Sequence, residues 1–227
     1  MRPVEKGAAP AVYTNYQDAL PHLRSRLGDF CSYCERQIET NLAVEHIQPK
    51  LHVPALRNAW SNFLLSCGNC NSSKGDTPVE LAAYLWPDRD NTLRGLEYAK
   101  GGLIDPNPTL PASIQARARA LIRLTGLDKY PGNPGRRPSS KDLRWLKREQ
   151  VWKLAELNRQ RLIATDTPGL RESIVETALG RGLFSIWWTV FAGDVDMRRR
   201  LRQAFLGTHS GCFDANEDVV PRAGGQI

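Results

Sequence analysis

Two short apolar runs stand out in the first third of the chain. Residues 42–47 read LAVEHI and residues 62–66 read NFLLS, which is typical of short strands. The segment between them contains Pro49 and Pro54, neither of which fits a central strand, so it is expected to form a loop. After the second run, residues 70–76 are expected to open a helix, because their short Asn and Ser side chains favour helix starts.

The rest of the chain shows apolar positions at helical spacing. A short helix is expected around residues 16–27, in the lead-in to the first strand. Another is expected over residues 114–125, with Gly126 as its stop. Ser140 could cap a third helix. Residues 170–191 form one further helical candidate that becomes uniformly apolar towards its end.

Turn-rich segments divide the chain into parts. WPDRDNT from Trp86, IDPNPTLP from Ile104 and YPGNPGRRPSS from Tyr130 are rich in turn-forming residues, and the third precludes regular structure. The fold class predicted is α+β, a small ββα module followed by an α-helical domain. The expected parts are a lead-in with a short helix (1–29), the module (30–90), a turn-rich connector with one helix (91–138) and the helical domain (139–227).

The charge of the chain favours a polyanionic partner. Its 227 residues carry a net charge of +7, and neutralising phosphates with Lys and Arg releases condensed counterions. Charge alone leaves nucleic-acid binding and an ordinary basic surface about equally supported. The same two readings stay open for one cationic cluster, which is either a solvated helix face or a phosphate-contacting patch. Its members are Arg198, Arg199, Arg200 and Arg202.

No segment is predicted to cross a membrane or to direct secretion. The longest run without charge, residues 183–193, is about half a membrane span, and the first residues lack the apolar core of a signal peptide. We therefore expect a cytoplasmic location and no membrane partner. In that reducing compartment the five cysteines are not expected to form disulfides.

Four of the five cysteines form two CxxC pairs, Cys31–Cys34 and Cys67–Cys70. Two residues between thiolates allow both sulfur atoms to reach one tetrahedral ion, and two such pairs complete a closed structural zinc site. A redox pair is the competing reading, but redox chemistry needs only one pair. Cys212 is left over and is interpreted as a buried or idle thiol. Because the module is too small to bury a large core, the metal would supply folding free energy that packing cannot.

Three further motifs lie between or beside the cysteine pairs. They are EHIQPK at 45–50, NFLL at 62–65 and CNSSKG at 70–75. In this order and within this frame they resemble the HNH family of ββα-metal nucleases, in the subtype whose motif is flanked by CxxC pairs. The resemblance covers Phe30 to Asp76 and implies a metal-dependent endonuclease that hydrolyses phosphodiester bonds in nucleic acid, with DNA favoured over RNA, and leaves 5′-phosphate ends.

The resemblance assigns roles residue by residue. His46 matches the general base that takes a proton from the attacking water, a role suited to imidazole. Glu45 matches the acidic ligand of the catalytic divalent ion, where many relatives carry Asp. Asn71 matches the residue that completes this site from the helix, and such oxygen ligands suit Mg²⁺ or Mn²⁺. Asn62 matches the central Asn that braces the loop carrying the base.

Two lysines are candidate contacts for nucleic acid. Lys74 follows Asn71 by about one helical turn and would be positioned to contact a phosphate, and Lys50 ends the first motif. Taken singly, these motif residues have ordinary readings, such as a core histidine for His46, a helix cap for Asn71 and a solvated charge for Lys74. Their joint occurrence inside the cysteine frame favours the nuclease interpretation.

A non-catalytic zinc-knuckle module that binds nucleic acid, or a scaffold subunit, is the alternative from another class. Glu45 and His46 together with Asn71 argue against it, because a pure binder has no physical need for them. The layout of an HNH module followed by an apolar-rich helical domain is also similar to the HNH subunits of Septu-type anti-phage systems. In those systems the nuclease works with an ABC-type ATPase, which the likeness implies as a partner.

Overall fold

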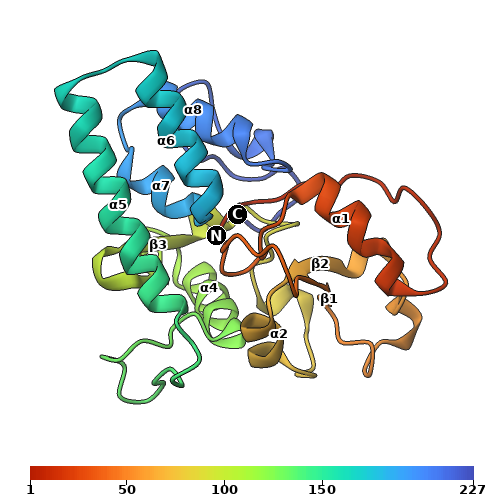
Figure 1. The fold of residues 1–227 in the computed structure, drawn as a ribbon. Helices are drawn as coiled ribbons and strands as arrows, with labels where there is room; N and C mark the ends of the chain where they lie inside the picture. The colour runs from red at the N-terminus through yellow and green to blue at the C-terminus, as the bar shows by residue number, and fades with distance from the viewer.

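The computed structural model describes all residues, 1–227. A strand–loop–strand–helix unit forms in the predicted order (Figure 1). Its helix begins at Gly68 and ends at Lys74, so residues 70–76 close a helix and do not open one as predicted. Its two strands pair antiparallel, with His46 opposite Phe63. The second strand is buried at every position, so this two-stranded sheet is covered by the rest of the chain. The unit consists of β1 (Ala43–His46), β2 (Phe63–Ser66) and α2 (Gly68–Lys74).

The lead-in forms the expected short helix in two parts. A 3-10 turn, η1 (Tyr16–Ala19), runs into α1 (Leu20–Leu27). Asn15 caps the turn by accepting a hydrogen bond from the backbone N–H of Gln17. Helix α1 buries Leu23 against the core and packs on β2, so the lead-in is part of the unit's packing.

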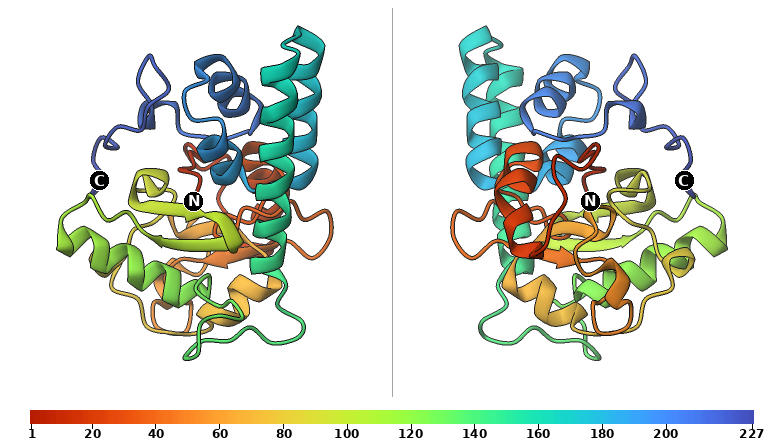
Figure 2. Two further views of the ribbon diagram at one scale, coloured as in Figure 1. Left: turned by 90° about the vertical axis from the view of Figure 1, so that its left-hand side faces the viewer. Right: turned by 90° about the vertical axis from the view of Figure 1, so that its right-hand side faces the viewer.

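The remaining chain adds a second hairpin and six helices. Short 3-10 turns, η2 (Pro54–Leu56), η3 (Trp60–Asn62), η4 (Leu81–Ala83), η5 (Lys100–Gly102) and η6 (Ser210–Cys212), lie in the connections. The larger elements are α3 (Thr92–Gly95), β3 (Leu96–Ala99), β4 (Leu103–Pro106), α4 (Ala112–Thr125), α5 (Arg144–Ala164), α6 (Pro168–Arg181), α7 (Phe184–Val190) and α8 (Val195–Ala204). Helices α5 and α6 lie side by side (Figures 1 and 2). Arg144, the first residue of α5, contacts Cys70 of α2. No helix is both long enough and apolar enough to cross a bilayer.

The hairpin β3–β4 was not predicted. Leu96 pairs with Pro106, and β3 alternates buried and exposed residues as a half-covered strand does. Its turn contains Gly101 and Gly102, both with positive φ. A Cβ at Gly102 would lie 2.2 Å from the carbonyl oxygen of Trp145, so this turn packs directly on the backbone of α5. The alternation in β3 was the overlooked signal.

Of two predicted boundaries in the helical part, one agrees with the structure and the other differs. Helix α4 ends at the predicted Gly126, which is left-handed. Helix α5, however, begins at Arg144 and not after Ser140. Instead of a Ser140 cap, the carboxylate of Asp142 accepts a hydrogen bond from the Arg144 backbone N–H at 3.3 Å. The predicted cap was therefore wrong, because the N-cap residue is Leu143, which forms no side-chain capping hydrogen bond.

The single helix expected over 170–191 is broken into α6 and α7. Gly182 (φ 67°) and Leu183 (φ 64°) both have left-handed backbones, which interrupts the helix. The break lets the chain reach the first cysteine turn, where Gly182 bridges to Arg36 and the Leu183 N–H donates to the Glu35 carbonyl at 2.8 Å. A contact distant in sequence therefore overrides the local helical pattern.

Gly182 offers a test of this contact. A Cβ there would lie 2.5 Å from the Gln37 backbone nitrogen and 2.5 Å from the Glu35 carbonyl oxygen. We expect Gly182→Ala to lower the free energy of unfolding by about 1–3 kcal/mol, because the left-handed backbone and the clash both oppose it. Gly180→Ala is the control, since a Cβ at this helical position meets nothing within 4 Å. It should raise stability by about 0.5–1 kcal/mol. Urea unfolding measures both, and equal effects would contradict the role given to the break.

Candidate functional site

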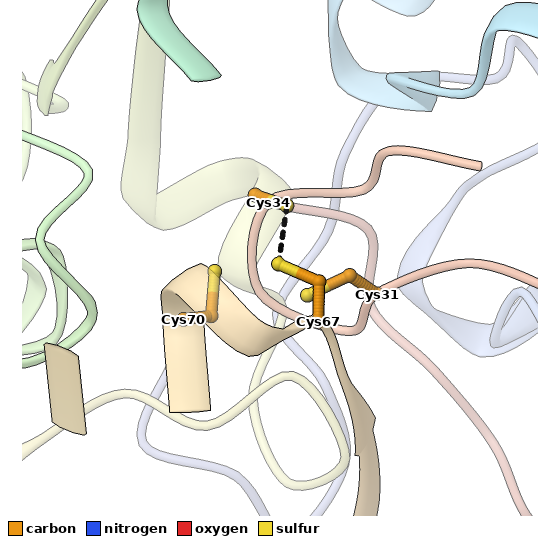
Figure 3. A group of neighbouring side chains, drawn as sticks. All are labelled: Cys31, Cys34, Cys67 and Cys70. Atoms are coloured by element: carbon orange, nitrogen blue, oxygen red, sulfur yellow. Dashed lines mark hydrogen bonds between the residues drawn. The ribbon is translucent and has the colours of Figure 1, made fainter. Parts of the chain in front are cut away.

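The four cysteines of the two CxxC pairs meet at one point. Their Sγ atoms all lie within 4.8 Å of one another, and all four residues are buried (Figure 3). The Sγ atoms of Cys34 and Cys67 are 3.7 Å apart. Four sulfur ligands around zinc, each about 2.3 Å from the ion, lie about 3.8 Å from one another in a tetrahedron. The cluster therefore fits a structural zinc ion, as the spacing predicted.

The backbone brings both cysteine turns to the end of β2. The Ser32 N–H donates to the Leu65 carbonyl at 2.8 Å, and the Leu65 N–H donates to the Ser32 hydroxyl at 3.2 Å. The first turn is thus attached to the strand, and Cys67 follows the strand directly. An ion bound by both turns would link the first turn to the end of β2 and the start of α2.

The buried thiols of the cluster need a nearby cation in order to ionise together. Burial raises the pKa of the Cys31 and Cys70 thiols well above the usual value, so these buried sulfurs resist ionisation unless positive charge is close. Two arginines supply part of it. Arg36 Nη2 lies 3.5 Å from Cys67 Sγ, and Arg144 Nη1 lies 3.0 Å from Cys70 Sγ. Zinc with four thiolates carries a net charge of −2, which these two guanidinium groups would partly offset.

Arg144 joins the cysteine cluster to the helical part of the chain. Its guanidinium is buried and also donates to the carbonyls of Thr125 at 2.7 Å and Gly126 at 3.1 Å. Asp142 accepts from its Nη2 at 2.7 Å. One side chain at the start of α5 therefore connects the zinc ligand on α2 to the end of α4.

Beside this cluster the surface is hollowed where β1 ends and α2 runs past it. The hollow has a volume of about 220 Å³. Five of the six predicted site residues outside the cysteine cluster line it, although adjacent strand residues normally point to opposite faces. Because His46 is the last residue of β1, the hollow lies at the strand's end. The lining includes Glu45, His46, Lys50, Asn71 and Lys74, together with Tyr16 and Asp76.

His46 is held as a neutral base. Its Nε2 lies 2.8 Å from the Arg57 carbonyl oxygen. Because a carbonyl can only accept, Nε2 carries the hydrogen and the neutral ring keeps its lone pair on Nδ1. The ring packs edge-on against Tyr16, at 4.8 Å between centroids, and against Phe63 at 5.4 Å. Burial lowers the pKa of His46 below its usual 6.5, and nearby Lys50 adds to this.

Glu45 and Lys74 form a buried ion pair in the wall of the hollow. Lys74 Nζ lies 2.8 Å from Glu45 Oε1, and both side chains are almost fully buried. The same amino group donates to the His46 carbonyl at 2.7 Å. Lys74 therefore faces inward in this structure and does not take the phosphate-contacting position suggested for it. Glu45 Oε1 is fully buried and has the Lys74 ammonium as its close partner.

Burial and charge act on Glu45 in opposite directions. Burial is the larger influence and raises the pKa of its carboxyl, the Lys74 ammonium lowers it, and the charge of Asp76 raises it slightly. The ion pair thus helps to keep a buried carboxylate charged. A divalent cation would favour the charged form in the same way.

Asn71 and Asp76 add oxygen atoms from the helix side. Asn71 is exposed on α2, and its side chain forms no hydrogen bond within the protein, so its carbonyl oxygen is free to bind an ion. Asp76 follows the end of α2 and is also exposed. Sequence reasoning did not select Asp76, although it directly follows the CNSSKG motif. With Glu45, these groups form an oxygen-rich donor set of the kind that suits Mg²⁺ or Mn²⁺.

Asn62 does not line the hollow but closes the loop between β1 and β2. Its Oδ1 accepts from the Gln48 N–H at 2.8 Å, and its Nδ2 donates to the carbonyls of Gln48 at 2.9 Å and Leu56 at 3.3 Å. That loop also carries Arg57, whose carbonyl orients His46. Asn62 is therefore a positioning residue, and its effect on activity stays a prediction.

Tyr16 is a residue of the hollow that the sequence did not reveal. Its ring lies between His46 and Lys50, whose Nζ is 4.5 Å from the ring centroid and 3.2 Å from the hydroxyl. Tyr16 belongs to the lead-in, almost thirty residues before the first motif. Only the packing of η1 against β1 brings it here, and no local pattern reports such a contact.

The comparisons agree with the geometry over this segment. The family model described as HNH endonuclease matches residues 31–77. This stretch includes both cysteine pairs, both strands and α2, and it ends beside the hollow. The chain therefore carries an HNH endonuclease domain in these residues. No curated protein matches the chain, so the likeness to Septu-type subunits has the layout alone in its favour.

Purified protein should hold about one zinc ion per chain, because four buried thiolates close one tetrahedral site. Cys70→Ala should lose that zinc and unfold the ββα unit, since ligation of structural zinc contributes about 10–16 kcal/mol in small zinc modules. Cys212→Ala is the matched control, as Cys212 is buried but outside the cluster. Metal analysis and circular dichroism report both properties. Folded, zinc-free wild-type protein would contradict the assignment.

The imidazole of His46 should titrate below pH 6.5 in zinc-loaded protein without any other divalent ion. Burial and nearby cations disfavour its charged form, so the ring should stay neutral at pH 7 and gain its proton only as the pH falls further. NMR titration of the ring resonances, assigned by comparison with His46→Ala, measures the midpoint. A midpoint at or above that of a model peptide would show that the surroundings of the base are wrongly described.

Proposed function

We propose that this protein is a metal-dependent endonuclease that hydrolyses phosphodiester bonds in nucleic acid, with DNA as the preferred substrate. One observation carries the proposal. Glu45, His46 and Asn71, which have separate roles in HNH nucleases, line one hollow beside a closed cysteine cluster. The family match over residues 31–77 supports the same reaction class.

His46 supplies the proton acceptor in this proposal. Water attacks phosphorus, and Nδ1 of His46 takes a proton from that water as the new O–P bond forms. The bond between phosphorus and the 3′ oxygen breaks, and this oxygen leaves with a proton from solvent. The products are a 5′-phosphate and a 3′-hydroxyl. The hydrogen bond to Arg57 and the two flanking rings hold the imidazole in one orientation.

Glu45 and Asn71 are the residues that would hold the catalytic ion, Mg²⁺ or Mn²⁺. When bound, such an ion offsets the negative charge that builds on the phosphate and leaving-group oxygens. Lys74 serves in this scheme as the inward counter-ion that keeps the Glu45 carboxylate charged and in place. Lys50, exposed at the rim, is the better placed of the two predicted lysines to contact a phosphate.

One observation favours the alternative function, a zinc-framed module that binds nucleic acid without cutting it. The Glu45 carboxylate already has a cationic partner in Lys74, so a bound ion must share the carboxylate or displace the amine. A role in anti-phage defence with an ABC-type ATPase, in the cytoplasm, is a further proposal. It is supported only by the order of a nuclease module and a helical domain.

Plasmid cleavage with Mg²⁺ or Mn²⁺ tests the proposed chemistry. His46→Ala should lower the rate by about 10²–10⁴-fold, because general-base catalysis contributes that much. It should leave zinc content and fold unchanged. His22→Ala removes an imidazole that does not line the hollow and should cut like wild type.

Glu45→Ala separates the two functions further. If Glu45 binds the ion, this variant should lose activity at low metal and regain part of it in excess Mn²⁺. A wild-type chain that binds DNA but never cuts it with either ion would favour the non-catalytic module. Equal cleavage by His46→Ala and wild type would refute the role of the base.

A further inference from the structure

The arginine cluster on α8 is occupied by acidic partners. The sequence left open whether these arginines contact phosphates. In the structure each of them is paired within the protein, so little of the cluster's charge is available to a polyanion. The pairs are Arg198 with Asp218 at 3.2 Å, Arg199 with Glu217 at 3.3 Å, Arg200 with Asp196 at 2.6 Å and Arg202 with Glu217 at 2.7 Å.

A different basic surface lies beside the HNH domain. Helix α4 packs against α2 (Figure 1), and between their exposed faces runs an open groove of about 600 Å³. Its wall contains three arginines and no acidic residue. The lining residues with polar groups are Ser73, Thr77, Tyr84, Arg119, Arg123 and Arg136.

Two of these arginines have no partner in the protein. Arg119 and Arg123 are exposed, and neither side chain forms an ion pair or a hydrogen bond. They lie four residues apart on α4, where like charges face each other and destabilise a helix by about 0.2–0.5 kcal/mol. Arg136 differs, because Asp128 pairs with it at 2.8 Å. An anion in the groove would relieve the repulsion between the two free arginines.

The groove and the candidate site share one turn of chain. Ser73 and Thr77 line the groove, while Lys74, Gly75 and Asp76 between them line the hollow that contains His46. A strand leaving the hollow over this turn would therefore pass directly to Arg119 and Arg123. Phosphate groups repeat along such a strand, and guanidinium groups bind them through paired N–H donors.

We propose that the α4 groove binds the phosphodiester backbone of the nucleic acid on one side of the scissile bond. This inference rests on the proposed function, because the groove would bind the same nucleic acid that the candidate site cleaves. Arg119 and Arg123 neutralise phosphates there and contribute affinity without reading sequence. The paired arginines of α8 contribute little.

The salt dependence of binding tests the groove. The full chain is prepared as His46→Ala, so that a short DNA duplex, or the matching RNA duplex, stays intact. Fluorescence anisotropy then gives the affinity across a range of salt concentrations without added divalent ion. In this background Arg119→Gln with Arg123→Gln should weaken binding and reduce the slope of log affinity against log salt by about two. The duplex that shows this change identifies the preferred substrate.

Arg199→Gln with Arg200→Gln is the control, since it removes the same charge from the paired cluster. Its slope should match that of the parent. The proposal is overturned if the groove variant and the parent have equal slopes. It is also overturned if both variants lose the same amount of slope, or if the parent does not bind at low salt. Thermal unfolding confirms that both variants fold. Cleavage is measured separately with the chain that keeps His46. If that chain cuts DNA but the groove variant binds with an unchanged salt slope, only the groove proposal is refuted. If that chain does not cut but the groove variant shows the reduced slope, only the proposed nuclease activity is refuted.

Discussion

Four thiol groups buried within 4.8 Å of one another impose the main constraint on this fold. Buried sulfurs at that distance cannot all be ionised without a cation between them, so the ionised cluster fits a bound zinc ion. The geometry that satisfies this need clamps the first cysteine turn to β2 and starts α2 directly after it. As a result, the end of β1 faces the side of α2. Glu45 and Asn71, which come from different elements, reach one hollow because the cysteines fix those elements.

The helical part of the chain takes part in the same arrangement. Arg144 brings a buried guanidinium to Cys70, and the break at Gly182 brings the start of α7 to the first cysteine turn. The carboxylate of Glu35, which belongs to that turn, is buried and accepts a hydrogen bond from the Ser185 N–H at 3.0 Å. One continuous apolar core includes residues of both parts. The small ββα unit therefore gains from its neighbours the burial that its own size cannot provide.

Sequence patterns predicted the structural features that depend on neighbouring residues and missed those that depend on contacts between distant parts of the chain. The apolar runs around β1 and β2, the CxxC spacing and the stop at Gly126 are local, and each was predicted. The break after α6 was missed because it is stabilised by a hydrogen bond from the Leu183 N–H to Glu35, which is distant in sequence. The position of Tyr16 in the hollow and the inward direction of Lys74 are likewise products of packing. Lys74 belongs to the motif and lines the hollow, but the motif does not indicate which neighbouring groups attract its charge.

The contact between Arg144 and Cys70 also has a consequence for the order in which the chain is made. The two residues are 74 positions apart, so a ribosome has finished both cysteine pairs well before it adds the arginine. A nascent chain that captures zinc at that stage carries a cluster whose charge only Arg36 offsets. Its metal would exchange more readily until α5 emerges and docks. The contact between Arg144 and Cys70 would thus form late in biosynthesis. Chains truncated before α5 should lose zinc to cellular chelators more readily than the full chain.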